Sequence, residues 1–361
     1  MSRKRVVIGM SGGVDSSVAA LLLKEQGYEV IGLFMLNWHE EDFYGACTAE
    51  EDYTDVRRVS SLLDIPYYTV DFSREYKDRV FRFFLDEYAK GRTPNPDVLC
   101  NREIKFGPFR DFAKKLGADY IATGHYAGLR TDENGLPVLY RAKDENKDQT
   151  YFLNQLTREQ LTDVLFPLTE ITKPEVRRIA EKHHLVTAEK KDSTGICFIG
   201  ERDFRKFLSE YLPMKEGDIK TLDGKTIGRH KGVFYYTIGQ RKGFGIGGAG
   251  NGEPYYVIYK DIYTNTLYVN QGECPELFSK ELTAENFNFI HRKITDGERV
   301  LARTRHRQEL VSATAYLINS STVRLVFDEP VRAVTPGQYA VIYCGRDCIG
   351  GGVISERTSS F

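Results

Sequence analysis

Two hydrophobic periods alternate along roughly the first 120 residues of the chain. Short apolar runs, such as RVVIGM at residues 5–10, are typical of buried strands, and segments with apolar positions at helical spacing separate them. The expected strands cover residues 5–10, 29–36, 66–72 and 118–124, and the expected helices cover residues 16–27, 53–64, 73–91 and 105–117. This βαβ series predicts an α/β fold, a doubly wound parallel sheet whose ligand lies at the carboxyl ends of its strands.

The pattern changes in the second half of the chain. One more helix is expected where Thr172 and Glu175 form a capping box, but helical periodicity fades after about residue 208. A glycine-rich loop follows at residues 243–253, and short alternating strands then continue to the end. We expect three parts: an α/β domain at residues 1–207, a small middle module at residues 208–280 and a C-terminal β-barrel at residues 281–361.

Composition narrows the class of protein. The chain has 361 residues, of which 41% are hydrophobic and 28% charged, and its formal net charge is −1. These values are ordinary for a globular protein, so a nucleic acid would have to be bound by local basic patches. No apolar run approaches the ~20 residues of a membrane span, and we expect no signal peptide. The six cysteines are scattered, which favours a reduced, cytoplasmic protein that does not contact a membrane.

The sequence GMSGGVDSS at residues 9–17 joins the first expected strand to the first expected helix. Its glycines and hydroxyl groups suit a loop whose backbone N–H groups cradle a phosphate at a helix N-terminus. It is neither a Walker A loop nor a GxGxxG loop, because neither pattern is present. The structural alternative is a glycine-rich turn in which Asp15 and Ser16 cap the helix, but capping alone does not require two glycines and two serines.

This strand, loop and helix resemble the pyrophosphatase loop of enzymes that cleave ATP to AMP and pyrophosphate. The resemblance implies ATP as a substrate, with magnesium on its pyrophosphate and Asp15 helping to hold the ion. It assigns ATP binding to Gly9, Met10, Ser11, Gly12, Gly13, Val14, Asp15 and Ser16. Members of this loop family adenylate an oxygen and then displace AMP with a nucleophile, and the loop alone does not choose among them.

Two cysteines stand in distinctive surroundings, Cys100 in GRTPNPDVLCNREIKF and Cys197 in KKDSTGICFIGERDF. A lone cysteine is often a small buried hydrophobe, and it can also be a disulfide partner, a metal ligand or a nucleophile. Spacing alone leaves these roles open. Cys344 and Cys348 have no second cysteine pair nearby, so we expect no structural zinc and no other resident metal site.

These two segments, together with ATGHY, KDQTYFL, TIGQRKGFGIGG, FDEPVRAVTPGQ and CIGGG, resemble the tRNA-specific 2-thiouridylase family over essentially the whole chain. The resemblance implies ATP-dependent 2-thiolation of the wobble uridine in lysine, glutamate and glutamine tRNAs. It implies that Cys197 carries a persulfide and that Cys100 attacks it, forming a transient disulfide and freeing sulfide, or else assists the transfer. The thiolate is the reactive form, so we expect cations near both cysteines, with Lys105, Lys190 and Lys191 as candidates.

The same resemblance assigns residues to the two small ligands. Asp97 is the expected acid or base at the uridine, and Asn95, Pro96 and Asp97 are expected to shape the pocket of the target base. The structural alternative is a plain turn, because Asn, Pro and Asp in succession favour a turn in any protein. Met35 and Gly124 are expected to contact the adenine of ATP.

Local basic patches are the expected sites of tRNA, the main partner. Residues 225–242 interleave lysine and arginine with aromatic residues, and Arg303, Arg305 and Arg307 alternate so that they would share one face of a strand. A solvated charged face is the structural alternative for both patches. The family resemblance places tRNA contacts at His125, Lys147, Asp148, Gln149, Arg305, His306 and Gln338. It also makes residues 1–207 the catalytic domain and residues 208–280 a tRNA-binding module.

The expected sulfur donor is a cysteine desulfurase or a sulfur-relay protein. Two rival functions are kept beside the thiolase. One is an amide-forming ligase with a pyrophosphatase loop, which would act on a small molecule and be indifferent to both cysteines. The other is a non-catalytic RNA-binding protein, against which the intact SGGVDS loop and the two cysteines argue.

Overall fold

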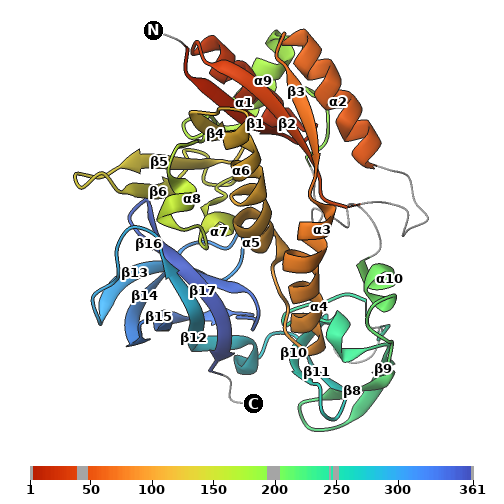
Figure 1. Cartoon of the computed structure of the whole chain (residues 1–361). Coiled ribbons are helices and arrows are strands. Elements are labelled where there is room, and N and C mark those ends of the chain that lie inside the picture. Colours follow the sequence, from red (N-terminus) through yellow and green to blue (C-terminus); the bar gives the residue numbers. More distant parts are fainter. Residues whose placement is uncertain (1–2, 39–47, 193–203, 244, 247–251, 359–361) are drawn as a thin grey trace.

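The computed structural model describes residues 3–38, 48–192, 204–243, 245–246 and 252–358. It has three parts: an α/β domain at the top of Figure 1, and a β-barrel and a small β module side by side below it. Within the described residues, no helix is long and apolar enough to cross a membrane.

A five-stranded parallel sheet forms the centre of the α/β domain, in the order β3-β2-β1-β4-β7. Its strands are β1 (Arg5–Met10), β2 (Glu29–Leu36), β3 (Tyr67–Asp71), β4 (Tyr120–Ala122) and β7 (Val164–Leu165). The helices α1 (Val14–Glu25), α2 (Thr48–Leu62) and α9 (Lys173–Lys182) cover one face, and α6 (Pro108–Lys115) covers the other. Along β1, Val6 and Ile8 pack on the first face and Val7 on the second, as the period of a strand requires. The predicted doubly wound sheet is confirmed.

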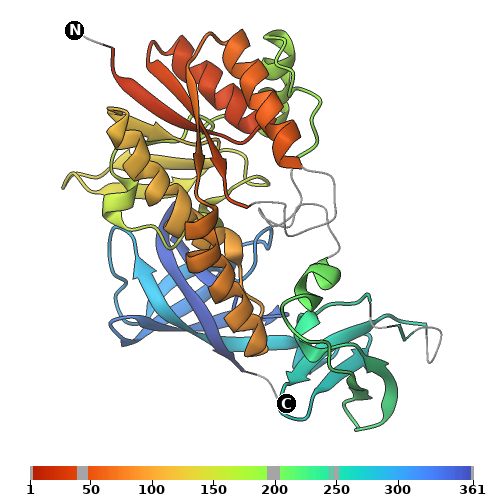
Figure 2. The same ribbon diagram turned by 45° about the vertical axis from the view of Figure 1, so that its right-hand side comes forward.

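A long helical run leaves the sheet after β3 and passes between the barrel and the module (Figure 2). It consists of α3 (Ser73–Tyr76), the π-helical segment η2 (Lys77–Phe81) and α4 (Arg82–Ala89). The run stops before Gly91, whose φ of +75° favours glycine, and any side chain there would collide with Ile262 of the module. The short helix α5 (Pro96–Cys100) and a second π-helical segment, η3 (Asn101–Lys105), follow.

The middle module is built on a four-stranded sheet in the order β10-β11-β8-β9. Its elements are α10 (Phe204–Ser209), β8 (Gly217–Thr221), β9 (Thr226–His230), η4 (Val233–Tyr235), β10 (Tyr255–Asp261), β11 (Thr266–Gln271) and η5 (Pro275–Leu277). Ile238 and Ile258 of the module pack with Leu277 and with Ala333 of the barrel, so an apolar cluster joins the two parts. The predicted glycine-rich loop lies partly outside the described residues.

Six antiparallel strands close into the C-terminal barrel, because the first, β12, pairs with the last, β17. The strands are β12 (Phe278–Phe289), β13 (Glu298–Arg303), β14 (Val311–Asn319), β15 (Thr322–Arg332), β16 (Tyr339–Cys344) and β17 (Asp347–Arg357). The predicted barrel is therefore confirmed. A hairpin of the α/β domain, β5 (Ala127–Thr131) and β6 (Pro137–Arg141), extends the same sheet by pairing Tyr140 with Asp347. The short helices α7 (Thr150–Leu153) and α8 (Arg158–Leu161) come next along the chain.

The three parts meet at the segment that leads into α5. The backbone N–H of Thr93 donates to the carbonyl of Pro336 in the barrel at 2.9 Å, and its hydroxyl lies 3.3 Å from that of Thr237 in the module. Gln338 of the barrel donates from Nε2 to the Thr93 carbonyl at 2.8 Å. The helix that carries Cys100 therefore starts where all three parts are in contact.

Candidate active site

The loop between β1 and α1 has the geometry of a phosphate-binding turn. Gly12 adopts φ +74°, and a Cβ at this position would lie 2.6 Å from the carbonyl oxygen of Asp52. The hydroxyl of Ser16 accepts from the Ser11 N–H at 3.2 Å and donates to the Gly13 carbonyl at 3.1 Å, which holds the loop against the helix. Gly13 is the N-cap and has no side chain with which to cap α1. The first N–H groups of α1 are therefore available to an anion.

Asp15 faces away from the helix cap and toward a lysine. Both of its carboxylate oxygens accept hydrogen bonds from the Lys173 ammonium, at 2.7 and 2.8 Å, and one also accepts from the Tyr126 hydroxyl at 2.8 Å. Burial, and then the neighbouring Asp15 charge, raises the pKa of Tyr126, so its proton stays in this bond. The alternative in which Asp15 merely caps α1 does not describe these contacts.

A second carboxylate, Asp192, continues the same charged network. It lies 2.8 Å from the Lys173 ammonium, 2.6 Å from that of Lys147 and 2.9 Å from the Arg177 guanidinium. Burial alone would raise the pKa of Asp192, but hydrogen bonds from Lys147 and Lys173 outweigh it and hold the pKa at about 2. The network links the phosphate loop to Lys147, a predicted tRNA contact, and Asp192 is the last described residue before the segment 193–203.

The two residues predicted to contact adenine lie beside the phosphate loop. Met35 is half-buried on β2, and its Cε lies 3.8 Å from where a Cβ on Gly9 would stand. A Cβ on Gly124 would lie 2.8 Å from the backbone nitrogen of Ser16, so only glycine allows this approach. Gly124 follows β4 and the loop follows β1, and the strand order reverses between these two strands, where α/β sheets bind ligands. Their contact with adenine stays a prediction.

Cys100 is the last residue of α5 and is buried, with 1% of its surface exposed. The helix starts with Asn95 as its N-cap, whose side-chain oxygen accepts from the Asp97 N–H at 3.2 Å, and with Pro96 in its first turn. Asn95 and Asp97 are half-buried. The predicted base-pocket residues thus stand one helical turn from Cys100, whereas the other predicted cysteine, Cys197, lies outside the described residues.

The lysines expected beside the cysteines have different surroundings. The Lys190 ammonium is bound between Asp52 and Asp55, at 2.6 Å from each. Lys105 ends η3, five residues after Cys100, and its charge adds to burial in lowering the pKa of His125. The carboxylates of α2 therefore hold Lys190.

His125 lies inside the α/β domain. Its ring is buried against Phe106 and Phe166, and its Nδ1 lies 2.8 Å from the Thr123 hydroxyl. Burial, and then the Lys105 charge, lowers the pKa of His125 well below its ordinary value, so the ring is neutral. Its contact with RNA stays a prediction.

Among the other predicted tRNA contacts, Arg305, His306 and Gln338 lie at boundaries between the three parts, whereas Gln149 bonds within the α/β domain. The side-chain oxygen of Gln149 accepts from the Tyr126 N–H at 3.0 Å. The Arg305 guanidinium donates to the carbonyl of Ile238 in the module at 3.4 Å. His306 packs on the ring of Phe152 at 4.3 Å between centroids, and burial, followed by nearby arginines, lowers the pKa of His306 to about 4.

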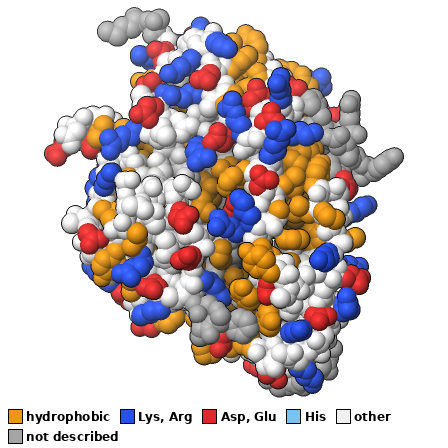
Figure 3. Space-filling model, turned by 60° about the horizontal axis from the view of Figure 1, so that its bottom comes forward, with side chains coloured by type: hydrophobic (Ala, Val, Ile, Leu, Met, Phe, Trp, Pro, Cys, Tyr) orange, Lys and Arg blue, Asp and Glu red, His pale blue; other side chains and the backbone are white. Residues whose placement is uncertain are grey.

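The arginine patch does not share a strand face as predicted. Strand β13 ends at Arg303, while Arg305 and Arg307 belong to the turn that follows. Arg307 adopts φ +66°, and Thr304 bonds the side chain of Gln308 at 2.8 Å, so the backbone turns before the alternation can continue. On the face drawn in Figure 3, lysine and arginine side chains are mixed with acidic ones and form no continuous basic field.

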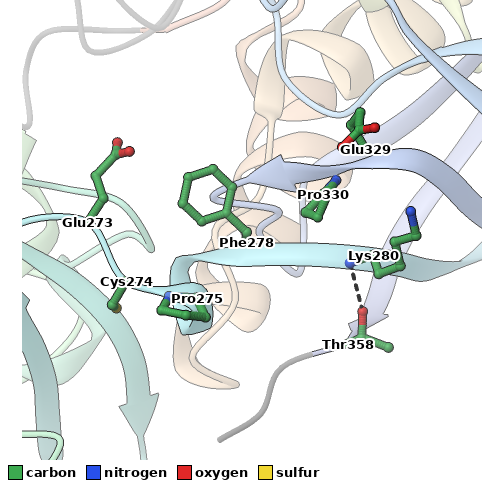
Figure 4. A pocket seen from close by; sticks show the side chains of 8 residues that line it. All are labelled: Glu273, Cys274, Pro275, Phe278, Lys280, Glu329, Pro330 and Thr358. Atoms are coloured by element: carbon green, nitrogen blue, oxygen red, sulfur yellow. Dashed lines mark hydrogen bonds between the residues drawn. The ribbon is translucent and has the colours of Figure 1, made fainter.

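A cavity of about 790 Å³ lies between the module and the barrel (Figure 4). Its described lining consists of Glu273, Cys274, Pro275, Phe278, Lys280, Glu329, Pro330 and Thr358. None of these residues is one that the sequence predicted for ATP, uridine or tRNA. The residues predicted for ATP and for the target uridine therefore lie elsewhere, in the phosphate loop, on β2, after β4 and in α5.

Sequence reasoning missed four members of the charged network: Lys173, Tyr126, Arg177 and Asp192. One signal was available for Lys173, which occupies the first position of α9. A cation is unfavourable beside the positive end of a helix dipole, so a lysine at this position indicates a nearby anion.

Family models match all three parts of the chain. They are described as the tRNA methyl transferase HUP domain at residues 4–201, the tRNA methyl transferase PRC-barrel domain at residues 205–271 and the aminomethyltransferase beta-barrel domain at residues 279–354. The descriptions of the first two models mention methyl transfer. The relatives that match nearly the whole chain are tRNA-specific 2-thiouridylases, and the enzyme class is taken from them.

Curated relatives match nearly the whole chain. The tRNA-specific 2-thiouridylase MnmA 1 of Geobacillus kaustophilus is 57% identical over 358 residues, which cover 99% of this chain and 96% of that protein. MnmA of Bacillus subtilis is 57% identical over 356 residues, which cover 98% and 95%. Among solved structures, the U34-tRNA thiolase NcsA of Methanococcus maripaludis is 21% identical, covers 58% of this chain and 64% of its own, and has a TM-score of 0.35, too low to support an argument.

Proposed function

The chain belongs to the tRNA-specific 2-thiouridylase family of sulfurtransferases, and on this premise we propose that it uses ATP to replace the 2-oxygen of the wobble uridine by sulfur in lysine, glutamate and glutamine tRNAs. The use of ATP is supported best by one observation, the pairing of the phosphate loop with a buried cation. Lys173 bonds both oxygens of Asp15 at the start of α1, beside helix N–H groups that no side chain caps. This arrangement suits a polyphosphate.

The first step is adenylation of the target base. The 2-oxygen of uridine forms a bond to the α-phosphorus of ATP, and the bond from that phosphorus to pyrophosphate breaks. The loop residues 9–16 bind the phosphates, Lys173 balances the charge that develops on the leaving pyrophosphate, and Met35 and Gly124 bind the adenine. When bound, a magnesium ion would supply further positive charge to the pyrophosphate. Asp15 would be its carboxylate ligand, which suits an ion that takes one or two carboxylates with phosphate and water.

The second step delivers sulfur. Cys197 carries the persulfide, and the Cys100 thiolate attacks its inner sulfur, so that a Cys100–Cys197 disulfide forms and hydrosulfide leaves. Hydrosulfide then attacks C2 of the adenylated uridine and displaces AMP. The two cysteine sulfurs are oxidised and the transferred sulfur is reduced, so a thiol reductant resets the enzyme between turnovers.

The base pocket and the tRNA surface follow from the same proposal. Asn95, Pro96 and Asp97 hold the extruded uridine, and Asp97 acts as acid or base, because their turn of α5 lies at the meeting point of the three parts. A uridine in a folded anticodon loop must leave the base stack before chemistry can reach it. The tRNA contacts are proposed at His125, Lys147, Gln149, Arg305, His306 and Gln338.

The partners and the domain roles complete the proposal. A cysteine desulfurase or a sulfur-relay protein loads Cys197, and the reaction takes place in the cytoplasm. Residues 1–207 form the catalytic domain, residues 208–280 a tRNA-binding module and residues 281–361 the barrel domain.

Adenylation coupled to thiolation predicts equal yields of AMP, pyrophosphate and 2-thiouridine. We expect persulfide-loaded enzyme with magnesium, ATP and unmodified glutamate tRNA to form AMP and 2-thiouridine in a one-to-one ratio. Radiolabelled ATP and nucleoside analysis of the same reaction measure both. The matched control is the same tRNA with cytidine at the wobble position, which should give neither product. AMP formation that needs an amine and ignores tRNA would instead support the amide-forming ligase.

A further inference from the structure

A buried ion pair joins the α/β domain to the C-terminal barrel. Asp148 lies between β6 and α7, and Arg303 is the last residue of β13. The Arg303 Nη1 lies 3.2 Å from the Asp148 carboxylate, and the two side chains are 6% and 0% exposed. They are 155 residues apart in the sequence. In the structure, the Asp148 carboxylate is therefore directed at a barrel residue and shielded from solvent.

The rest of this polar cluster is also buried. The Thr150 hydroxyl lies 3.0 and 2.9 Å from the two Asp148 oxygens and 3.2 Å from the Tyr343 hydroxyl in the barrel. The Arg303 guanidinium also lies over the Tyr343 ring, 5.8 Å from its centroid. Its Nε is buried without a hydrogen-bond partner in the described part of the chain. Burial raises the pKa of Asp148, while the hydroxyl of Thr150 and the charge of Arg303 oppose that rise.

Such a pair contributes little to stability but fixes geometry. Removing two charges from water costs about as much as their attraction returns, and here one guanidinium N–H is left unpaired. What the pair determines is how the end of β13 is placed against residues 147–152. The ring of His306 packs on Phe152, at 4.3 Å between centroids, so its position depends on the same placement.

We propose that Asp148 and Arg303 are positioning residues for tRNA binding. Their ion pair affects the binding by placing other residues, and neither side chain contacts RNA. The pair aligns His306 of the barrel with Lys147 and Gln149 of the α/β domain, so that both sides of the tRNA surface are presented together. This inference rests on the proposed function, because it needs tRNA as the ligand of these residues. It replaces direct RNA contact as the role of Asp148.

A double-mutant cycle on the full-length chain tests this. The variants are Asp148→Asn, Arg303→Met and the double variant, and the readout is the dissociation constant for unmodified glutamate tRNA at several salt concentrations. We expect each single variant to weaken binding about tenfold, and the double variant to bind no more weakly than the worse single one, because all three lose the same contact. The slope of log K against log salt should stay at the wild-type value in all three.

Direct contact of these side chains with RNA predicts a different pattern. The losses of tRNA affinity in the two single variants would then multiply in the double variant. Arg303→Met would also lower the slope of log K against log salt by roughly 0.7–0.9 in magnitude, the effect of losing one phosphate contact. That result would overturn the proposal. If Arg303→Met does not fold, as judged by thermal unfolding, Arg303→Lys takes its place in the cycle. A double variant that binds no more weakly than the worse single one again supports the proposal, and multiplied losses again overturn it.

Two controls separate this inference from the others. Arg299→Met removes an exposed arginine of the same strand, paired with Asp328, and should leave tRNA affinity unchanged. The ATP affinity of the Asp148 and Arg303 variants should also match that of the wild type, because neither side chain bonds a side chain of the phosphate-loop network. If the wild-type protein neither binds nor thiolates tRNA, the proposed function fails. If it does both and the cycle is multiplicative, only this inference fails.

Discussion

Replacing Cys100 by serine should lower 2-thiouridine formation by at least about a thousandfold, a conservative value against the roughly 10⁶-fold loss seen when an essential nucleophile is removed. Serine has nearly the same shape, so the buried end of α5 should keep its structure at a cost of about 1–3 kcal/mol for the buried hydroxyl. The hydroxyl cannot form the disulfide that frees hydrosulfide from the Cys197 persulfide. Single-turnover reactions of persulfide-loaded enzyme, analysed for 2-thiouridine, measure the effect.

The same experiment separates the two ways in which Cys100 could act. If Cys100 frees hydrosulfide, the serine variant keeps its persulfide and forms no bond to tRNA. If instead the persulfide attacks the base first and Cys100 then cleaves the adduct, the variant accumulates tRNA joined to Cys197 through a disulfide that a thiol reductant releases. Cys344→Ser is the matched control, since this cysteine is exposed in the barrel and should not affect the rate. Wild-type turnover by Cys100→Ser would contradict both versions.

Replacing Lys173 by methionine should lower the rate of AMP and 2-thiouridine formation by about 10²–10³-fold, or roughly 2.7–4 kcal/mol of transition-state stabilisation. Its side chain is 11% exposed, and its ammonium balances Asp15 and Asp192 at once. Without it, two carboxylates and the departing pyrophosphate are left with too little positive charge. Steady-state kinetics with ATP as the varied substrate measure the loss, which we expect mainly in kcat because the charge develops during the reaction.

Two comparisons make this prediction specific. Lys182→Met changes an exposed lysine at the other end of α9 and should leave the rate unchanged. Persulfide loading of Cys197 should be normal in Lys173→Met, because loading needs no ATP. Wild-type kcat in Lys173→Met would remove Lys173 from the adenylation step and leave only a structural role.

Hydrophobic periodicity was enough to predict the architecture. The strands around residues 5–10 and 29–36 are buried on both faces, so they appear as continuous apolar runs, and the alternating strands of the barrel have one face in its core. The hairpin at residues 127–141 was missed, because it is short and its partner, Asp347, lies more than 200 residues further along the chain. Local pattern carries no information about such a pairing.

Only those residues of the site that belong to contiguous sequence motifs were predicted. The phosphate loop is a contiguous motif, and the structure places a turn in it at Gly12. Lys173 lies 158 residues from Asp15, and no periodicity relates the two positions. Charge in the sequence was also a poor guide to exposure: Arg303 looks like part of an RNA-binding patch, but its guanidinium is buried against a carboxylate.

Nucleoside mass spectrometry of glutamate tRNA after reaction shows whether the protein thiolates tRNA and whether Cys197 carries the sulfur. Unmodified tRNA would be incubated with magnesium, ATP and a persulfide donor, with either the wild-type protein or Cys197→Ser. We predict a 2-thiouridine peak with the wild type that needs ATP and disappears in the variant. A peak that survives in Cys197→Ser would remove the proposed sulfur carrier. No peak with the wild-type protein, when donor and tRNA are shown to be competent, would contradict the proposed thiolation of tRNA.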